Sequence, residues 1–339
     1  MVMDIANEVM INLTPRFSPF WLFNILITMT SILVFRVENR RDNDKCNKMR
    51  ECIIIAILNG YIPKAYYWVA SWSRLKKSID GYTKQLECHD RAQNKNISLP
   101  RRTNVNCVLK AGRGHNYDFD INITYADILT TTHNIEFKFN AESVCDAPQF
   151  VSPMHPSKYL TSSFEEYYYD NYLPQLADSA QLLLPDRKTY LDSIHSTSPK
   201  CMQAYQTKYY HGCAQSSRFL NRQSDIAFYE LAKRIDLECR QSFIARTDLN
   251  TDVLSEYLLA SQTGKKYMLF STKTRDLILQ TINADDYILV KELTTKNIEK
   301  CRYECVSKSG KHIHVLLRWK NGNGIAYPAF QISEVRVPK

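Results

Sequence analysis

Glycine is scarce in this chain, at 9 of 339 residues, and neither G-x-x-x-x-G-K-[ST] nor G-x-G-x-x-G occurs in it. Both motifs need glycine where the backbone approaches a phosphate closely. Their absence argues against a glycine-rich nucleotide-binding architecture, and we expect no small-molecule cofactor. The sequence also contains no internal repeat and no low-complexity tract.

The ten cysteines are widely spread and form no C-x-x-C pair. They lack the dense spacing of small secreted domains that are held together by disulfides. This usage favours a reducing, intracellular compartment, either the cytoplasm or the nucleus. The N-x-[ST] triplets at Asn12, Asn96 and Asn122 carry no meaning in such a compartment.

Long apolar runs are limited to residues 17–35, FSPFWLFNILITMTSILVF. This segment has about the 20 residues of a membrane-spanning helix. However, it contains Pro19 and Asn24, and no clearly basic stretch precedes it. We expect a buried helix or strand pair, and no membrane partner. Two alternatives stay open: a membrane anchor through residues 17–35, and an extension that precedes a start at Met49.

The chain does have ample apolar and basic residues. Apolar residues make up 44% and aromatic residues 12%, which is typical of a folded globular protein. There are 44 Lys and Arg against 35 Asp and Glu, a net charge of +9. A basic excess is compatible with a polyanionic partner such as DNA, because cations near phosphates release condensed counterions.

Hydrophobic periodicity divides the chain into helical and strand-like regions. Residues 49–87 predict two helices separated near Gly60, and residues 105–140 predict strands. Residues 163–246 predict four main helical pieces, the first of which begins with a capping box of Ser163 and Glu166.

The last 75 residues predict strands again, with hairpin turns at 309–310 and 321–324. We therefore expect an α/β protein in three parts. These are an N-terminal apolar segment and linker (1–48), a core with a helical insertion (49–265) and a β-rich C-terminal part (266–339).

Residues 116–140, NYDFDINITYADILTTTHNIEFKFN, carry charged side chains on one face of two neighbouring strands. Period-two alternation places Asp118 and Asp120 on that face of the first strand, and Glu136 and Lys138 on that face of the second. If the strands pair antiparallel, the carboxylates meet and repel each other unless a cation lies between them. Mg²⁺, which prefers oxygen ligands, suits such a pair. Lys138 could lower the pKa of an attacking water or stabilise charge on a phosphate.

An acidic residue on one strand, followed by an apolar-flanked [D/E]-x-K on the next, resembles the PD-(D/E)XK nucleases. Glu136 and Lys138 match the family's E-x-K, and its first aspartate matches Asp118 or Asp120, with Asp127 as a third candidate. The resemblance implies a restriction-endonuclease-like fold, a mixed sheet flanked by helices, with the nuclease-like core at 49–265.

The resemblance also implies a function. We expect a Mg²⁺-dependent DNA endonuclease, with Mn²⁺ as a substitute, that hydrolyses phosphodiester bonds and is a candidate for sequence-specific cleavage. The metal ligands would be Asp118 or Asp120 together with Glu136, and Lys138 would position or polarise the nucleophile. A homodimer is a candidate assembly, because sequence-specific restriction enzymes of this family are often dimers. Endonucleolytic against exonucleolytic cleavage, and DNA against RNA, stay open.

Basic residues near these motifs are candidates for DNA contacts. Lys110 and Arg113 lie in or beside the turn AGRGHNY, and Arg318 and Lys320 flank Trp319. The alternative function is a non-catalytic DNA-binding protein on a degenerate nuclease fold. The blander alternative is a half-buried hairpin with surface ion pairs. A C-x3-C-x6-H-x-H set at 301–314 resembles a zinc site only superficially, because its spacing fits no common finger.

Overall fold

A computed structural model describes most of the chain. The described residues are 28–36, 40–94, 98–110, 115–126, 129–146, 149–151, 155–195, 200–209, 222–319 and 328–335. They form a mixed α/β protein with two five-stranded sheets, as the sequence predicts at the level of fold class. The chain divides into two compact units: Met1–Val144 with Gly264–Thr281, and Cys145–Thr263 with Ile282–Lys339.

The sheet of the first unit is mixed, with the strand order β1-β2-β3-β5-β6. Its first three strands are antiparallel neighbours, β3 and β5 are parallel, and β6 pairs antiparallel with β5. The parallel pair requires a long crossover, because the two strands run in the same direction. The strands are β1 (Arg102–Leu109), β2 (Phe119–Tyr125), β3 (Leu129–Phe139), β5 (Lys266–Phe270) and β6 (Leu277–Gln280).

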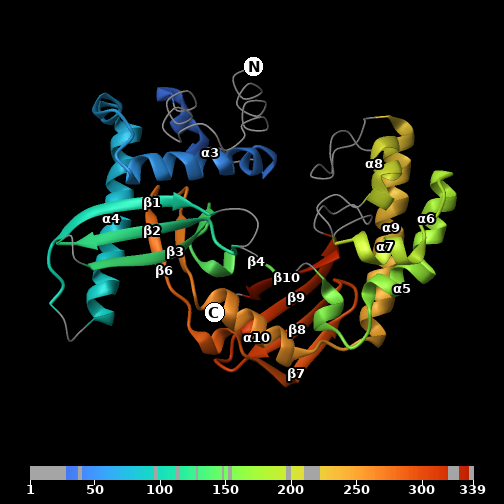
Figure 1. The fold of residues 1–339 in the computed structure, drawn as a ribbon. Coiled ribbons are helices and arrows are strands. Elements are labelled where there is room, and N and C mark those ends of the chain that lie inside the picture. The colour runs from blue at the N-terminus through green and yellow to red at the C-terminus, as the bar shows by residue number, and fades with distance from the viewer. Residues whose placement is uncertain are drawn as a thin grey trace. The chain divides into compact units, whose positions relative to one another are not determined.

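Two long helices cover this sheet (Figure 1), and α3 packs beside β1 whereas α4 packs beside β6. They are the two helices predicted from residues 49–87, and they are separated by a short 3₁₀ helix. On β2, Phe119, Ile121 and Ile123 are buried in the core of this unit, as alternation predicts. The helices of this unit are η1 (Met29–Arg36), α3 (Arg40–Leu58), η2 (Lys64–Trp68) and α4 (Ala70–Gln93).

The apolar segment 17–35 is described only from residue 28 onward. Within that part, Ile32, Val34 and Phe35 of η1 are buried in the core of the first unit. Among the described residues, no helix is long and apolar enough to cross a membrane.

The second unit has an antiparallel sheet with the order β4-β10-β9-β8-β7. Gly310, at φ +84°, occupies the turn between β8 and β9, where the sequence predicts a hairpin. The turn predicted at 321–324 lies outside the described residues. The strands are β4 (Gln149–Phe150), β7 (Leu289–Asn297), β8 (Arg302–Ser307), β9 (His312–Trp319) and β10 (Pro328–Val335).

Helices α5 to α9 of the second unit lie together, and α10 packs against β7 (Figure 1). Ser163 caps α5 by accepting a hydrogen bond from the backbone N–H of Glu166 at 3.2 Å. Short 3₁₀ helices precede β4 and α5 (η3, Val144–Asp146; η4, Pro156–Tyr159), α8 (η5, Lys200–Met202) and β7 (η6, Ala284–Tyr287). The α-helices are α5 (Phe164–Asn171), α6 (Leu173–Ala180), α7 (Arg187–Ser193), α8 (Gln203–Tyr209), α9 (Gln223–Arg246) and α10 (Thr251–Gln262).

The two units divide the chain differently from the three parts expected from the sequence. The strands at 266–270 and 277–280 belong to the sheet of the first unit, because β5 pairs with β3. The expected boundary at residue 265 therefore falls between Gly264, where the first unit resumes, and β5. Residues 49–144 and 145–263 belong to separate units.

Candidate active site

A cavity of about 270 Å³ opens at the polar face of β3 in the first unit. Asp118, Glu136 and Lys138, which the sequence places on one face, all line it. Its remaining lining comes from two aromatic residues of β3 and from two polar residues of α3, namely Phe137, Phe139, Asn47 and Glu51. The fold therefore brings the acidic residue before β2 and the E-x-K of β3 to one place.

Asp118 lies at the point where β2 begins. Its backbone N–H donates to Ile135 O at 2.8 Å, and its carbonyl accepts from Lys110 N at 2.8 Å, so the sheet hydrogen bonds extend one residue before the strand. Its side chain then accepts a hydrogen bond from the backbone N–H of Phe137 at 2.9 Å. This bond fixes the carboxylate beside Glu136 and uses a donor of β3.

Glu136 is buried and lies between two lysines. Its Oε1 contacts Nζ of Lys138, and its Oε2 contacts Nζ of Lys265. Lys265 reaches this position because it immediately precedes β5, which pairs in parallel with β3. Its ammonium group also donates to Asn116 O at 3.0 Å.

The two lysines decide the charge of Glu136. Burial by itself would raise the pKa of Glu136, but the positive charges of Lys138 and Lys265 outweigh it and lower that pKa. Burial lowers the pKa of Lys265, and the neighbouring charge of Lys138 adds to this effect, while Glu136 opposes it. The carboxylate is therefore ionised at neutral pH, and two cations share it.

The other two acidic groups of the cavity, Asp118 and Glu51, have raised pKa values, in contrast to Glu136. Burial raises the pKa of Asp118, and the negative charge of Glu136 raises it further, against the hydrogen bond from Phe137. Burial also raises the pKa of Glu51, although Lys48, at 2.8 Å, opposes this rise. Crowded carboxylates of this kind are stabilised by a cation among them.

Helix α3 is tied to this region by Arg50, which is fully buried. Its guanidinium donates to Val34 O at 2.9 and 2.8 Å and to Oδ1 of Asn47 at 2.7 Å. It also lies 3.5 Å from the ring centroid of Phe139, a cation–π contact. Arg50 thereby holds Asn47 at the cavity and joins α3 to β3.

The other predicted ligands are placed differently. Asp120 lies on β2, two residues after Asp118, and does not line the cavity. Its Oδ2 is 3.2 Å from Nζ of Lys110. One of its oxygens, Oδ1, is buried without a hydrogen-bond partner. Asp127 lies outside the described residues. Of the two candidate aspartates that the structure describes, Asp118 lines the cavity with Glu136 and Asp120 does not.

The candidate DNA contacts fall in both units. Lys110 of the first unit pairs with Asp120. Arg318, on β9 of the second unit, donates to Oε1 of Gln331 at 2.8 Å. Arg113 and Lys320 lie outside the described residues.

The cysteine–histidine set at 301–314 does not gather into one cluster. Cys305 points to the buried face of β8, in the alternation that also buries Tyr303. His312 and His314 lie on the opposite, more exposed face of β9. No disulfide joins the cysteines in the part of the chain that the structure describes.

Two residues of the site were missed by the sequence analysis. Glu51 stands next to the apolar run CIIIAIL, and an acidic residue in the buried turn of a helix is a signal that could have found it. Lys265 is 129 residues from Glu136. Only the parallel pairing of β3 and β5 brings these two together, so local sequence carries no signal for it.

No protein-family model matches the chain, and no curated protein is similar to it. The function is therefore inferred from the geometry of the site.

Proposed function

We propose that this protein is a metal-dependent DNA endonuclease whose first unit is a restriction-endonuclease-like core. Its sheet carries an aspartate at the start of β2, the E-x-K on the neighbouring β3, and a parallel β5 beyond it. Helices α3 and α4 flank this sheet. The arrangement agrees with the mixed, helix-flanked sheet that the PD-(D/E)XK resemblance implies.

One observation carries the proposal: Asp118, Glu136 and Lys138 line the same cavity. The carboxylate of Asp118 also accepts a hydrogen bond from the backbone N–H of Phe137, which lies 19 residues further along the chain, so the two strands are joined at the cavity. Side chains on two strands that only support a surface would be expected to make exposed ion pairs. Here Glu136 is buried and faces a cavity together with two further carboxylates, which is an unusual and costly arrangement for a purely structural face.

The donor set suits Mg²⁺, because carboxylate and amide oxygens are its preferred protein ligands. Asp118 and Glu136 would hold the ion, with Glu51 as an added carboxylate. Burial first, and a neighbouring carboxylate second, raise the pKa values of Asp118 and Glu51, and a bound cation would oppose both effects. When bound, such an ion supplies charge stabilisation and lowers the pKa of a bound water.

The chain's own residues would complete the chemistry. Lys138 extends into the cavity with its ammonium group next to Glu136, where it can donate hydrogen bonds to a phosphate oxygen and stabilise developing negative charge. Asp118 is held rigidly by its bond to the Phe137 N–H, so it does not have to be ordered when substrate binds. The net charge of +9 supports a polyanionic substrate.

A second candidate function is non-catalytic DNA binding on a degenerate nuclease fold. The contacts of Glu136 favour it, because Lys138 and Lys265 occupy both of its carboxylate oxygens. Two lysines can neutralise this carboxylate without any metal. On this alternative the protein binds DNA in a salt-sensitive manner but does not cleave it. A homodimer is proposed for either function.

The test is cleavage of closed circular and linear duplex DNA by the full chain. Wild type, Glu136→Ala and Lys138→Ala are each incubated with Mg²⁺, Mn²⁺ or EDTA. We expect metal-dependent nicking or linearisation of the circle by wild type, lost in both variants. Discrete fragments would indicate sequence specificity, whereas a smear would indicate a non-specific enzyme.

Glu142→Ala serves as the matched control, because Glu142 lies just beyond β3 and its side chain is exposed. We expect this variant to cleave like wild type. Cleavage by Glu136→Ala at the wild-type rate would contradict the proposed site. Retention of DNA on a gel, without cleavage in any metal, would favour the binding module.

A further inference from the structure

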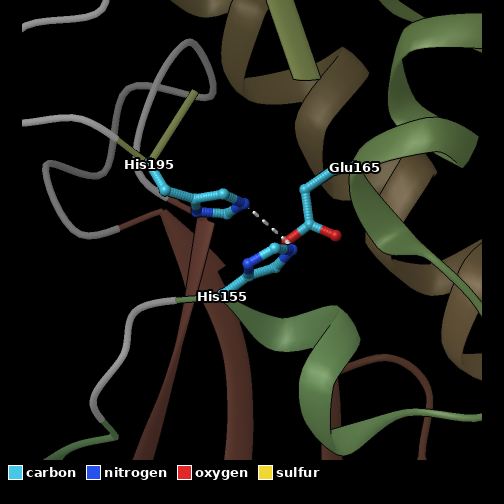
Figure 2. Close-up of side chains that lie close together, drawn as sticks. All are labelled: His155, Glu165 and His195. Carbon is cyan, nitrogen blue, oxygen red and sulfur yellow. Dashed lines mark ion pairs between the residues drawn. The ribbon is translucent and has the colours of Figure 1, made fainter. Parts of the chain in front are cut away.

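A second cluster of ligand-type side chains lies in the other unit, far along the chain from the acidic cavity. His155, Glu165 and His195 converge there, and one potential ligand atom of each lies within 4.8 Å of the other two. Figure 2 shows both imidazole rings beside the Glu165 carboxylate. The second unit thus contains a two-histidine, one-carboxylate set that the nuclease proposal does not use.

Three separate segments build this cluster. Glu165 lies in the first turn of α5, His155 immediately precedes η4, and His195 follows α7. Nε2 of His195 lies 3.2 Å from Oε1 of Glu165, and Nε2 of His155 lies 3.9 Å from the same oxygen. The two rings stack with their centroids 3.9 Å apart.

Glu165 is the unusual member, because its side chain is only 3% exposed. Both of its carboxylate oxygens, and both ring nitrogens of His195, are buried without a hydrogen-bond partner. The 3.2 Å approach of His195 to Glu165 therefore lacks hydrogen-bond geometry. A buried carboxylate without hydrogen bonds is costly, and native structures rarely leave one so.

The two imidazole rings stack with their centroids 3.9 Å apart, and their Nε2 atoms lie 3.2 and 3.9 Å from one carboxylate oxygen that accepts no hydrogen bond from either. A divalent cation between the three side chains would satisfy all of them together.

We propose that His155, Glu165 and His195 form a binding site for a divalent transition-metal ion, Zn²⁺ above all. Two imidazole nitrogens and one carboxylate oxygen are donors that Zn²⁺ takes in proteins, and a set of three leaves a further position for water or another ligand. In the tetrahedral geometry that Zn²⁺ prefers, ligand atoms about 2.1 Å from the ion lie about 3.4 Å from one another. The three candidate ligand atoms lie within 4.8 Å of one another, so the side chains would have to close by up to about 1.4 Å around the ion.

The site would also link parts of the second unit. A metal held there joins η4, α5 and the end of α7, so binding is coupled to the folding of this region. The proposal thus predicts a thermal effect as well as a metal content. It does not depend on whether the first unit cleaves DNA.

The experiment measures zinc in the purified full chain after dialysis, by elemental analysis. The background is the double variant Asp118→Asn, Glu136→Gln, which removes two of the three carboxylates of the acidic cavity and so weakens it as a competing cation site. We expect about one Zn²⁺ per chain in this background, and its loss in Glu165→Gln and in His195→Gln. Co²⁺ should give a ligand-field absorption band in the background protein that both variants lack.

Glu166→Gln and His312→Gln are the matched controls, since both residues belong to the second unit and have exposed side chains. They should retain the ion.

Added Zn²⁺ should raise the melting temperature of the background by about 5 °C, and should not raise that of Glu165→Gln. If Glu165→Gln does not fold, His195→Gln, with a more exposed side chain, decides the matter. Equal zinc in ligand variants and controls, or no zinc in the background, would overturn the proposal.

Discussion

Glu136 and Glu165 are both buried glutamates, but their surroundings in the two units differ. Glu136 contacts two lysine ammonium groups and faces a cavity. Glu165 has two neighbouring imidazoles and no hydrogen bond to either oxygen. The side chain is the same in both cases, so the difference lies in the groups that surround each carboxylate.

The comparison separates a charge-compensated site from an uncompensated one. The two lysines lower the pKa of Glu136, so this carboxylate is ionised at neutral pH although it is buried. Histidines are neutral ligands as well as potential cations. Their pairing with an unsatisfied carboxylate is therefore better explained by a metal ion than by an ion pair alone.

The largest stability effect should come from removing one lysine of the compensated site. Lys265→Met leaves Glu136 with Lys138 alone, and we expect it to lower the free energy of unfolding by about 3 kcal/mol. The reason is that a buried carboxylate loses half of its compensation. Chemical denaturation of the full chain measures the effect.

Two further variants test that explanation. Lys265→Met combined with Glu136→Gln should recover part of the loss, because no buried charge is left behind. Lys273→Met, which removes an exposed lysine paired with Glu142, should change little. Equal stability of Lys265→Met and wild type would contradict the role given to Lys265.

An intermediate effect on stability is expected at Asp90. This third buried carboxylate has two hydroxyl groups and an imidazole as partners. Its Oδ2 accepts hydrogen bonds from Tyr125 at 2.8 Å and Thr131 at 2.7 Å, and Nε2 of His133 lies 3.1 Å away. Burial works against ionisation, but these hydrogen bonds outweigh it and lower the pKa of Asp90. Asp90→Asn should cost about 2 kcal/mol at neutral pH.

The pH dependence of that cost has a definite sign. Because the folded pKa of Asp90 is lower than its ordinary value of 3.8, its contribution is fully present above pH 3.8. It is lost as the pH falls through the lower, folded value. The difference between Asp90→Asn and wild type should stay constant from neutral pH down toward that region and then shrink. Asp80→Asn, at an exposed pair with Lys76, is the control.

The smallest effect, and one of opposite sign, is expected at the uncompensated site. In EDTA, Glu165→Gln should raise the free energy of unfolding by about 1 kcal/mol, because an amide costs less to bury than an unpaired carboxylate. With Zn²⁺ present the order should reverse. Denaturation curves of Glu165→Gln and wild type in both conditions would show this, and a clear loss of stability in EDTA would count against the comparison.

Much of the local structure could be predicted from sequence because it depends on short-range patterns. Helix α9 spans Gln223–Arg246, the helical stretch expected from its periodicity. Alternation correctly predicts that Phe119 and Phe137 are buried. It predicts the exposure of their charged neighbours only in part, because Glu136 is also buried. Helix α10 and the four-residue β6 were not predicted, because each is short and lacks a strong pattern.

The site could be predicted only where its residues lie close together along the chain. Asp118 and Glu136 lie at two consecutive antiparallel strands, so alternation was enough to predict their shared polar face. Lys265 requires the parallel β3–β5 pair, and Glu51 requires α3 to pack at the same cavity. The triad of the second unit depends on three segments that no periodicity relates.

The most direct test of the nuclease site compares Asp118→Asn with Asp120→Asn in cleavage of closed circular DNA with Mg²⁺. The two aspartates are two residues apart, but only Asp118 lines the cavity. We predict that Asp118→Asn lowers the cleavage rate by about 10²-fold or more, whereas Asp120→Asn cleaves like wild type. Cleavage by Asp118→Asn at the wild-type rate, or loss of cleavage in Asp120→Asn alone, would contradict the account.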